Sequence, residues 1–191
     1  MKEIILASAS PRRFELLSRL GLKFRVLPSK LEENIDLRLN AGEIAENVSF
    51  LKAENVAKKL DINAIVIGAD TIVVKDRILG KPQSCAEAFN MLKLLQGSWH
   101  SVITGITVIE TPGMKTIKGH EKTRVKFREL SDDEIISYIK TGEPEDKAGA
   151  YGIQGIGAIL VDRIEGCYFN VVGLPLTKLS LMLKDFNISI L

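Results

Sequence analysis

Two neighbouring arginines stand where a strand pattern gives way to a helix pattern. The segment Ser8-Ala9-Ser10-Pro11-Arg12-Arg13 follows the apolar run 4–7 and precedes the amphipathic run 14–20. Ser10 suits a helix N-cap and Pro11 suits the first turn, so free backbone N–H groups would lie beside two guanidinium groups. Arginine forks and helix N-termini both favour phosphate oxygens. The segment therefore predicts a phosphate or polyphosphate site, although a capped helix with solvated arginines fits the same residues.

Four further charged residues lie at the ends or on the surfaces of predicted elements: Glu33, Lys52, Asp70 and Lys81. Hydrolysis of a phosphoanhydride needs cations for the phosphates, carboxylates for a divalent ion and a base for water. The set supplies all three. Each residue taken singly also has an ordinary interpretation: Asp70 as a turn-former, Lys81 in a plain turn, Glu33 in an exposed loop, and Lys52 on a solvated helix face.

Several other chemistries are excluded by what the sequence lacks. It contains no P-loop, no Gly-x-Gly-x-x-Gly after a strand and no Gly-x-Ser-x-Gly elbow. His100 and His120 are the only histidines, which excludes a histidine-rich metal centre, and we expect ordinary polar roles for both. Cys85 and Cys167 are too few for a disulfide framework or a zinc site, so we expect ordinary thiols.

The composition indicates an intracellular protein with a real core. Its 191 residues are 46% hydrophobic, and we expect one domain over residues 1–191. A formal net charge of +2 and an aromatic content of 6% argue against nucleic-acid binding. No apolar run reaches membrane-spanning length and the start of the chain lacks a signal-peptide core, so we expect a cytoplasmic protein that binds no membrane.

Strand and helix patterns alternate almost from end to end, which predicts an α/β fold. Strands are predicted at 22–27, 64–68, 71–74, 77–79, 99–109 and 123–128, and as two short strands around Glu165-Gly166. Helices are predicted from Asn40 to about Ala57, from Ser84 to Gly97, from Ser131 to Lys140, and from about Pro175 to Phe186. Asp70 lies at a break between two strand signals. Segment 143–157 is rich in glycine, carries Gln154 as its one amide, and can approach a ligand closely.

The order and spacing of these motifs resemble the Maf family along nearly the whole chain. The resemblance rests on segment 8–13, Glu32-Glu33, Lys52-Ala53, Gly68-Ala69-Asp70-Thr71, Gly80-Lys81-Pro82, segment 146–155 and Val172-Gly173-Leu174-Pro175. It implies a Maf/ITPase-like α/β fold, elongated and two-lobed around a mixed, twisted sheet, with the active-site cleft between the lobes.

The resemblance also implies an activity, because members of the family are nucleoside triphosphate pyrophosphatases that cleave between the α- and β-phosphates. It makes Asp70 the proton acceptor for water and places Glu33 near the metal and the phosphates, so both carboxylates are candidate metal ligands. The implied phosphate-binding cations are Arg12, Arg13, Lys52 and Lys81, and Ser8 and Ser10 belong to the same loop as the arginines.

Thr71 and Gln154 match positions that set base preference in the family, together with one arginine of the first loop. Their identities are similar to those of the branch that acts on dTTP and UTP rather than the branch that acts on 7-methyl-GTP. An amide such as Gln154 can pair with the O4 and N3–H edge of thymine or uracil, which presents an acceptor beside a donor.

The same resemblance implies a divalent cation, with Mg²⁺ expected and Mn²⁺ or Co²⁺ as alternatives, since hard cations suit oxygen ligands. It also implies a nucleoside triphosphate substrate, a homodimer, and a role in nucleotide-pool house-cleaning linked to cell-division arrest. Two alternatives remain open. One is a nucleotide- or nucleic-acid-binding division regulator without turnover, and the other is a pyrophosphatase for damaged purine triphosphates, which would differ at Thr71 and Gln154.

Overall fold

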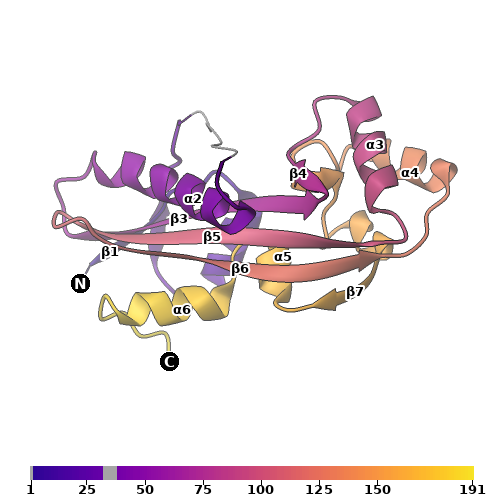
Figure 1. Ribbon diagram of the computed structural model, residues 1–191. Helices are drawn as coiled ribbons and strands as arrows, with labels where there is room; N and C mark the ends of the chain where they lie inside the picture. Colours follow the sequence, from indigo (N-terminus) through magenta and orange to yellow (C-terminus); the bar gives the residue numbers. More distant parts are fainter. Residues whose placement is uncertain (1, 32–37) are drawn as a thin grey trace. The chain divides into compact units, whose positions relative to one another are not determined.

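A mixed sheet forms the framework of the computed structural model, which describes residues 2–31 and 38–191 (Figure 1). The strands are β1 (Glu3–Leu6), β2 (Phe24–Val26), β3 (Ala64–Lys75), β4 (Arg77–Leu79), β5 (Trp99–Thr111), β6 (Lys115–Phe127) and β7 (Val161–Glu165). Their order is β2-β1-β3-β5-β6-β7, and β4 pairs with β3. β1 runs parallel to β2 and β3, whereas the pairs β3–β4 and β6–β7 are antiparallel. The predicted α/β class with a mixed sheet is confirmed.

Helices α1 to α4 begin where the sequence offers capping side chains. They are α1 (Pro11–Ser18), α2 (Ala41–Ala57), α3 (Cys85–Leu95), α4 (Asp132–Ile139), α5 (Tyr168–Val172) and α6 (Leu176–Lys184), with 3₁₀ helices η1 (Ala148–Ala150) and η2 (Ile156–Leu160). Asn40 and Ser131 form complete capping boxes, so α2 and α4 start as predicted. None of the helices in the described part of the chain has the length and hydropathy that crossing a membrane requires.

The chain divides into two compact units. The first consists of Met1–Asp70, Thr104–Glu121 and Gly173–Leu191, and the second of Thr71–Ile103 and Lys122–Val172. Strands β3, β5 and β6 therefore contribute residues to both units. The prediction of a single domain over residues 1–191 stays a prediction.

In the first unit, α2 packs directly on the sheet because two strand positions carry glycine. A Cβ on Gly68 of β3 would meet the Ser49 carbonyl oxygen and would lie 2.9 Å from the Ala53 Cβ. A Cβ on Gly105 of β5 would meet the Ala45 carbonyl in the same way. Figure 1 shows α2 lying along these strands. The glycines allow a closer helix–sheet approach than any larger residue would permit.

Two sequence predictions need correction. β3 is one continuous strand from Ala64 to Lys75, so the predicted break at Asp70 is wrong. Gly68 suggested that break, yet its role is to admit α2. The second short strand predicted after Glu165-Gly166 is also wrong, because α5 forms there. The Asn170 amide of α5 donates to the Val102 carbonyl oxygen at 3.0 Å, and this long-range bond favours the helix.

In the second unit, aromatic rings hold the middle of the glycine-rich segment 143–157. Tyr151 packs edge-on against Phe127, with ring centroids 4.7 Å apart, and its hydroxyl lies 2.8 Å from His100 Nε2. His100 is buried and its Nδ1 has no hydrogen-bond partner among the described residues. Burial, assisted by the charge of Lys75, lowers the pKa of His100 from 6.5 to about 4. The buried Tyr151 thus anchors the chain three residues before Gln154.

Candidate active site

The segment between β1 and α1 forms the capped turn that the sequence predicts. Ser10 has extended backbone angles, and its Oγ accepts the Arg13 N–H at 3.5 Å. Ser8 is buried, and its Oγ accepts the Ser10 N–H at 3.2 Å and an Arg13 Nη1–H at 3.2 Å. Arg13 Nε also donates to the Gly173 carbonyl oxygen at 2.9 Å. The guanidinium group is therefore oriented by two partners, and the interpretation of Arg13 as a freely solvated residue is wrong.

Lys52 and Asp70 form an ion pair within the first unit. The distance from Lys52 Nζ to Asp70 Oδ1 is 2.6 Å, and the side chains are only 16% and 10% exposed. Asp70 lies inside β3 and Lys52 on the face of α2 that Gly68 admits. The turn-former interpretation of Asp70 and the solvated-face interpretation of Lys52 are therefore both wrong.

The parallel pairing of β1 with β3 relates the first loop to Asp70. Leu6 pairs with Ile67, and the Ala7 N–H donates to the Ile67 carbonyl oxygen at 2.8 Å. Ser8 thus leaves the sheet at the level where β3 continues toward Asp70, as expected for loops that follow parallel strands. The first unit brings the Ser10-capped turn and the ion-paired carboxylate to the same end of the β1–β3 pair.

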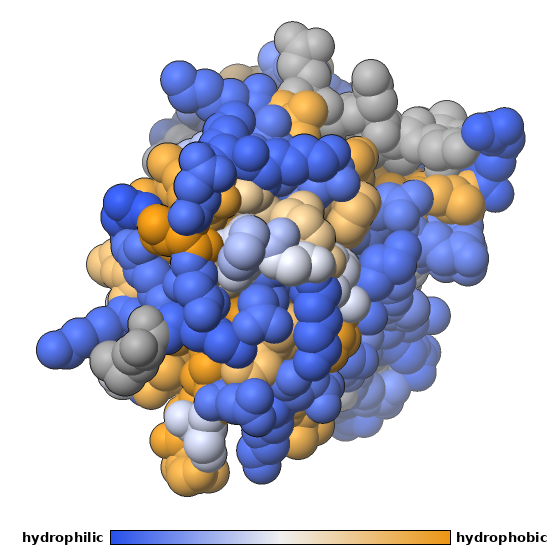
Figure 2. All heavy atoms as spheres, turned by 90° about the vertical axis from the view of Figure 1, so that its left-hand side faces the viewer, coloured by the Kyte–Doolittle hydropathy of each residue, from blue (hydrophilic) through white to orange (hydrophobic). Residues whose placement is uncertain are grey.

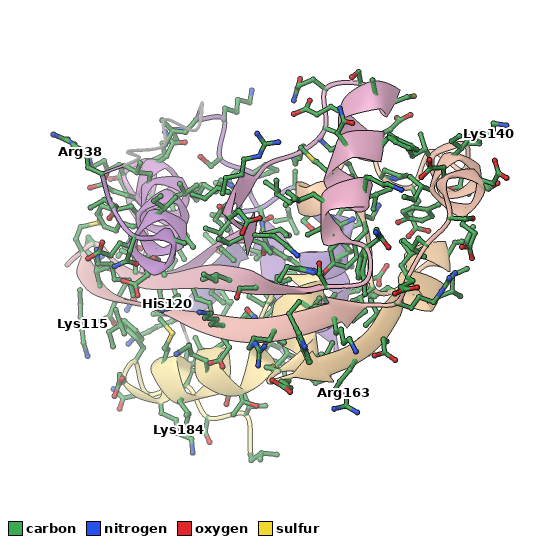
Figure 3. All side chains as sticks on the ribbon, turned by 45° about the vertical axis from the view of Figure 1, so that its right-hand side comes forward. Arg38, Lys115, His120, Lys140, Arg163 and Lys184 are labelled. Carbon is green, nitrogen blue, oxygen red and sulfur yellow. The ribbon has the colours of Figure 1, made fainter. Side chains whose placement is uncertain are left out.

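Positively charged groups of the site differ from ordinary surface cations. In Figure 3, the side chains of Lys140, Arg163 and Lys184 point away from the protein, and all three residues are exposed. Arg13 and Lys52 are instead half-buried and hydrogen-bonded, and Arg12 is half-buried in the same turn as Arg13. Cations held in this way lose less conformational entropy when they bind a phosphate.

Three predicted site residues belong to the second unit. Thr71 is half-buried in β3, whereas Lys81 and Gln154 are exposed. The Gly149 N–H donates to the Gly80 carbonyl oxygen at 3.0 Å, so the segment of Lys81 lies against the segment that leads to Gln154. Within residues 2–31 and 38–191, neither the Lys81 ammonium nor the Gln154 amide forms a hydrogen bond. Both polar groups can therefore bind a ligand without breaking a hydrogen bond to any described residue.

Glu33 lies outside the described residues. Among those that are described, no three His, Cys, Asp or Glu side chains gather as a metal site. Asp70 supplies one carboxylate, whose Oδ1 contacts Lys52, leaving Oδ2 as a second acceptor. A single protein carboxylate suits Mg²⁺, which takes its remaining ligands from water and substrate phosphates. The donor chemistry of Asp70 thus fits a divalent cation.

Two glycines that had no predicted role shape the site. Gly173 accepts the Arg13 Nε–H, and its backbone has a φ of 123°. Gly68 lets α2 bring Lys52 to Asp70. Both glycines belong to motifs that resemble the family, so the motifs located them, but the sequence alone did not disclose their contacts.

Known proteins resemble this chain over its full length. The family model described as Maf-like protein matches residues 3–186. A protein from Alkaliphilus oremlandii named dTTP/UTP pyrophosphatase is 56% identical, and the match covers 100% of both chains. A protein of the same name from Acetivibrio thermocellus is 53% identical, covering 100% of this chain and 98% of that one. The solved structure of a HAM1 protein from Coxiella burnetii shares the fold, with a TM-score of 0.55 at 17% identity, covering 97% of this chain and 100% of that one.

Proposed function

This chain belongs to the Maf family, and we propose that it is a pyrophosphatase that hydrolyses dTTP and UTP to the nucleoside monophosphate and pyrophosphate. The observation that carries the proposal is the 56% identity, over the full length, to a relative named dTTP/UTP pyrophosphatase. The ion-paired Asp70 and the neighbouring anion-binding turn are consistent with such chemistry.

The first loop binds the polyphosphate in this proposal. Arg12 and Arg13 provide guanidinium forks, and the Ser10-capped start of α1 adds backbone N–H groups and the positive end of the helix dipole. Ser8 and Gly173 orient Arg13 before the substrate arrives. Lys81, exposed in the second unit, is a further phosphate-binding cation in this proposal.

Asp70 accepts the proton of the attacking water, and Lys52 holds its carboxylate in place through Oδ1. Asp70 and Glu33 would hold the divalent cation, Mg²⁺ in our proposal, which neutralises phosphate charge when bound. Lys52 also offers a positive charge beside the carboxylate, so the pair tolerates the approach of a polyanion better than an isolated Asp70 would.

Gln154 and Thr71 read the base. The Gln154 amide is exposed and has no hydrogen bond among the described residues, so its oxygen and its NH₂ group can meet the N3–H and O4 edge of uracil or thymine. Cytosine and adenine present the reverse arrangement, an amino donor beside a ring-nitrogen acceptor. Base preference is thus proposed to lie in the second unit and bond cleavage in the first.

The experiment that tests the proposal incubates the purified protein with Mg²⁺ and, separately, dTTP, UTP, CTP, 7-methyl-GTP and ITP, and resolves the products by chromatography. We expect monophosphate and pyrophosphate from dTTP and UTP. Release of orthophosphate instead of pyrophosphate would contradict the proposed bond cleavage. Turnover confined to ITP would favour the damaged-purine activity, and nucleotide binding without turnover would favour the regulator.

A matched variant separates base reading from cleavage. Gln154→Ala should lower kcat/KM for dTTP about tenfold, because one paired edge of the base is lost. The rate on CTP should change little.

Two further parts of the proposal have their own tests. Omission of the divalent cation should abolish turnover of every substrate. The homodimer that we propose is checked by light scattering on the same preparation.

A further inference from the structure

The loop that carries Gln154 is organised by a carboxylate outside the predicted site. Glu143 lies just after α4 and is half-buried. Its Oε2 accepts the Ile156 N–H at 2.8 Å, and its Oε1 accepts the Gly157 N–H at 3.1 Å. These two N–H groups begin η2, whose own N-cap residue, Gly155, has no side chain to cap it. Glu143 therefore caps η2 from 13 residues upstream.

Tyr138 extends this contact to the other end of the loop. Its hydroxyl donates to Glu143 Oε1 at 2.9 Å and accepts the Gly152 N–H at 3.2 Å. Burial raises the pKa of Tyr138, and the hydrogen bond to Glu143 adds to the effect, so the hydroxyl remains a donor. Gln154 is thus held between two backbone anchors, Gly152 and Ile156.

Close packing explains two glycines of the loop. A Cβ on Gly155 would collide with Glu143 Oε2, and a Cβ on Gly157 would meet the Gly152 carbonyl oxygen and would lie 2.5 Å from the Tyr138 hydroxyl. Neither glycine has a φ in the left-handed region, and that of Gly155 is −96°. Their conformations do not demand glycine. Close packing around Glu143 and Tyr138 does.

We propose that Glu143 is a positioning residue for base recognition: it sets the loop 152–157, and through it the Gln154 amide, without touching the substrate. This inference rests on the proposed function. An amide binds a base edge more tightly when the loop that carries it is already ordered, because a mobile loop loses conformational entropy on binding. Glu143 supplies that order through charge-assisted hydrogen bonds, which are stronger than those between neutral groups.

The test is Glu143→Gln in the full-length protein. The new NH₂ group would face at least one N–H of Ile156 or Gly157, so at least one anchor would lose its acceptor. We expect KM for dTTP to rise about tenfold with kcat changed less than about twofold. The rate on CTP should stay near that of the wild type, so the ratio of kcat/KM for dTTP to that for CTP should fall.

A double-mutant cycle distinguishes positioning from general structural support. If Glu143 acts through Gln154, Glu143→Gln should have no further effect on the dTTP/CTP ratio in a Gln154→Ala background. Additive effects would overturn the inference, and so would an equal loss on dTTP and CTP. Glu145→Gln is the matched control, because Glu145 is an exposed carboxylate two residues further along. It should leave the ratio unchanged.

Tyr138→Phe keeps the inference testable if Glu143→Gln fails to fold. This variant removes only the hydroxyl that joins Glu143 to Gly152, and we expect a fall of about threefold in the same ratio. An unchanged ratio would overturn the inference. The wild type separates the two kinds of failure: if it leaves dTTP and UTP intact, the proposed function fails, whereas turnover with an unchanged ratio in Glu143→Gln refutes only the positioning role.

Discussion

The two compact units hold their functional side chains in different ways. In the first unit, Arg13, Lys52 and Asp70 are partly or fully buried, and side-chain contacts orient their charged groups directly. In the second unit, Gln154 is exposed, and it is its backbone neighbours that are fixed, by Glu143 and Tyr138. In our proposal, phosphate chemistry belongs to side chains that are already oriented, and base recognition to a side chain on an anchored loop.

The difference follows from what each group must bind. A polyphosphate carries the same charges whatever its nucleobase. Cations and a proton acceptor that are already oriented therefore serve every nucleoside triphosphate. An amide that reads a base edge must remain uncovered until the nucleotide arrives.

The side of the molecule in Figure 2 is mostly hydrophilic, with apolar residues in small groups. Such a surface is ordinary and carries no docking interpretation.

The largest effect is expected for Asp70→Asn. The amide cannot accept a proton as the carboxylate does, so kcat should fall roughly 100-fold or more while much of the nucleotide affinity remains. Steady-state kinetics with dTTP and UTP measure it. Asp76→Asn is the control, because Asp76 is exposed in the β3–β4 turn with a φ of 54°, which asparagine also tolerates. Wild-type turnover by Asp70→Asn would move the base to another residue.

A pair of glycine variants compares the two units directly. In Gly68→Ala the new methyl meets the Ser49 carbonyl, which belongs to the backbone, so we expect a loss of about 2 kcal/mol in unfolding free energy. In Gly155→Ala the obstacle is the end of the Glu143 side chain, which can move, so we expect less than about 1 kcal/mol. Denaturant unfolding measures both losses.

The same pair should differ in function. Gly68→Ala pushes α2 from β3 and should lower kcat for every nucleotide, because Lys52 and Asp70 separate. Gly155→Ala displaces the Glu143 carboxylate and should lower only the preference for dTTP over CTP. The contrast between the units is refuted if the two variants change stability and selectivity alike.

A smaller effect is expected for Arg13→Ala. Loss of one oriented guanidinium should raise KM for dTTP about tenfold and weaken binding of the nucleoside much less. Titration calorimetry with the triphosphate and the nucleoside compares the two. Arg19→Ala, an exposed residue at the end of α1, is the control. Equal losses for both ligands would rule out a phosphate role for Arg13.

A further effect is a pH dependence of stability that belongs to the second unit. The pKa of His100 is lowered from 6.5 to about 4 in the folded protein. Between pH 6.5 and pH 4, His100 therefore binds a proton in the unfolded chain but not in the folded protein. The unfolding free energy is therefore highest above about pH 6.5 and falls as the pH drops below that value. At about pH 5.5 the loss amounts to ~1 kcal/mol.

His100→Gln removes this titration. The variant should lose less stability than the wild type between about pH 7 and about pH 5.5, as measured by denaturant unfolding at each pH. An identical pH dependence in the two proteins would mean that other groups dominate. Base selectivity near neutral pH should change little, since the Tyr151 hydroxyl can still meet a polar partner in the variant.

Local signals in the sequence predicted much of the fold. Ser10, Asn40 and Ser131 cap helices as expected, because a cap and its N–H partners lie within one turn. The hairpin that follows Thr71 was also predicted and is present as β3–β4. The break at Asp70 was wrong because a glycine in a strand has two causes, a bend or a close neighbour, and only packing distinguishes them.

The candidate site divides along the same line. The sequence by itself determined the residue types, their order and the family that they resemble, since these are properties of the chain. Only the tertiary structure decided that Lys52 meets Asp70 across 18 positions, that Arg13 meets Gly173 across 160, and that Glu143 caps η2. Those contacts depend on how closely backbones approach, and that distance is set by packing between segments remote in the chain.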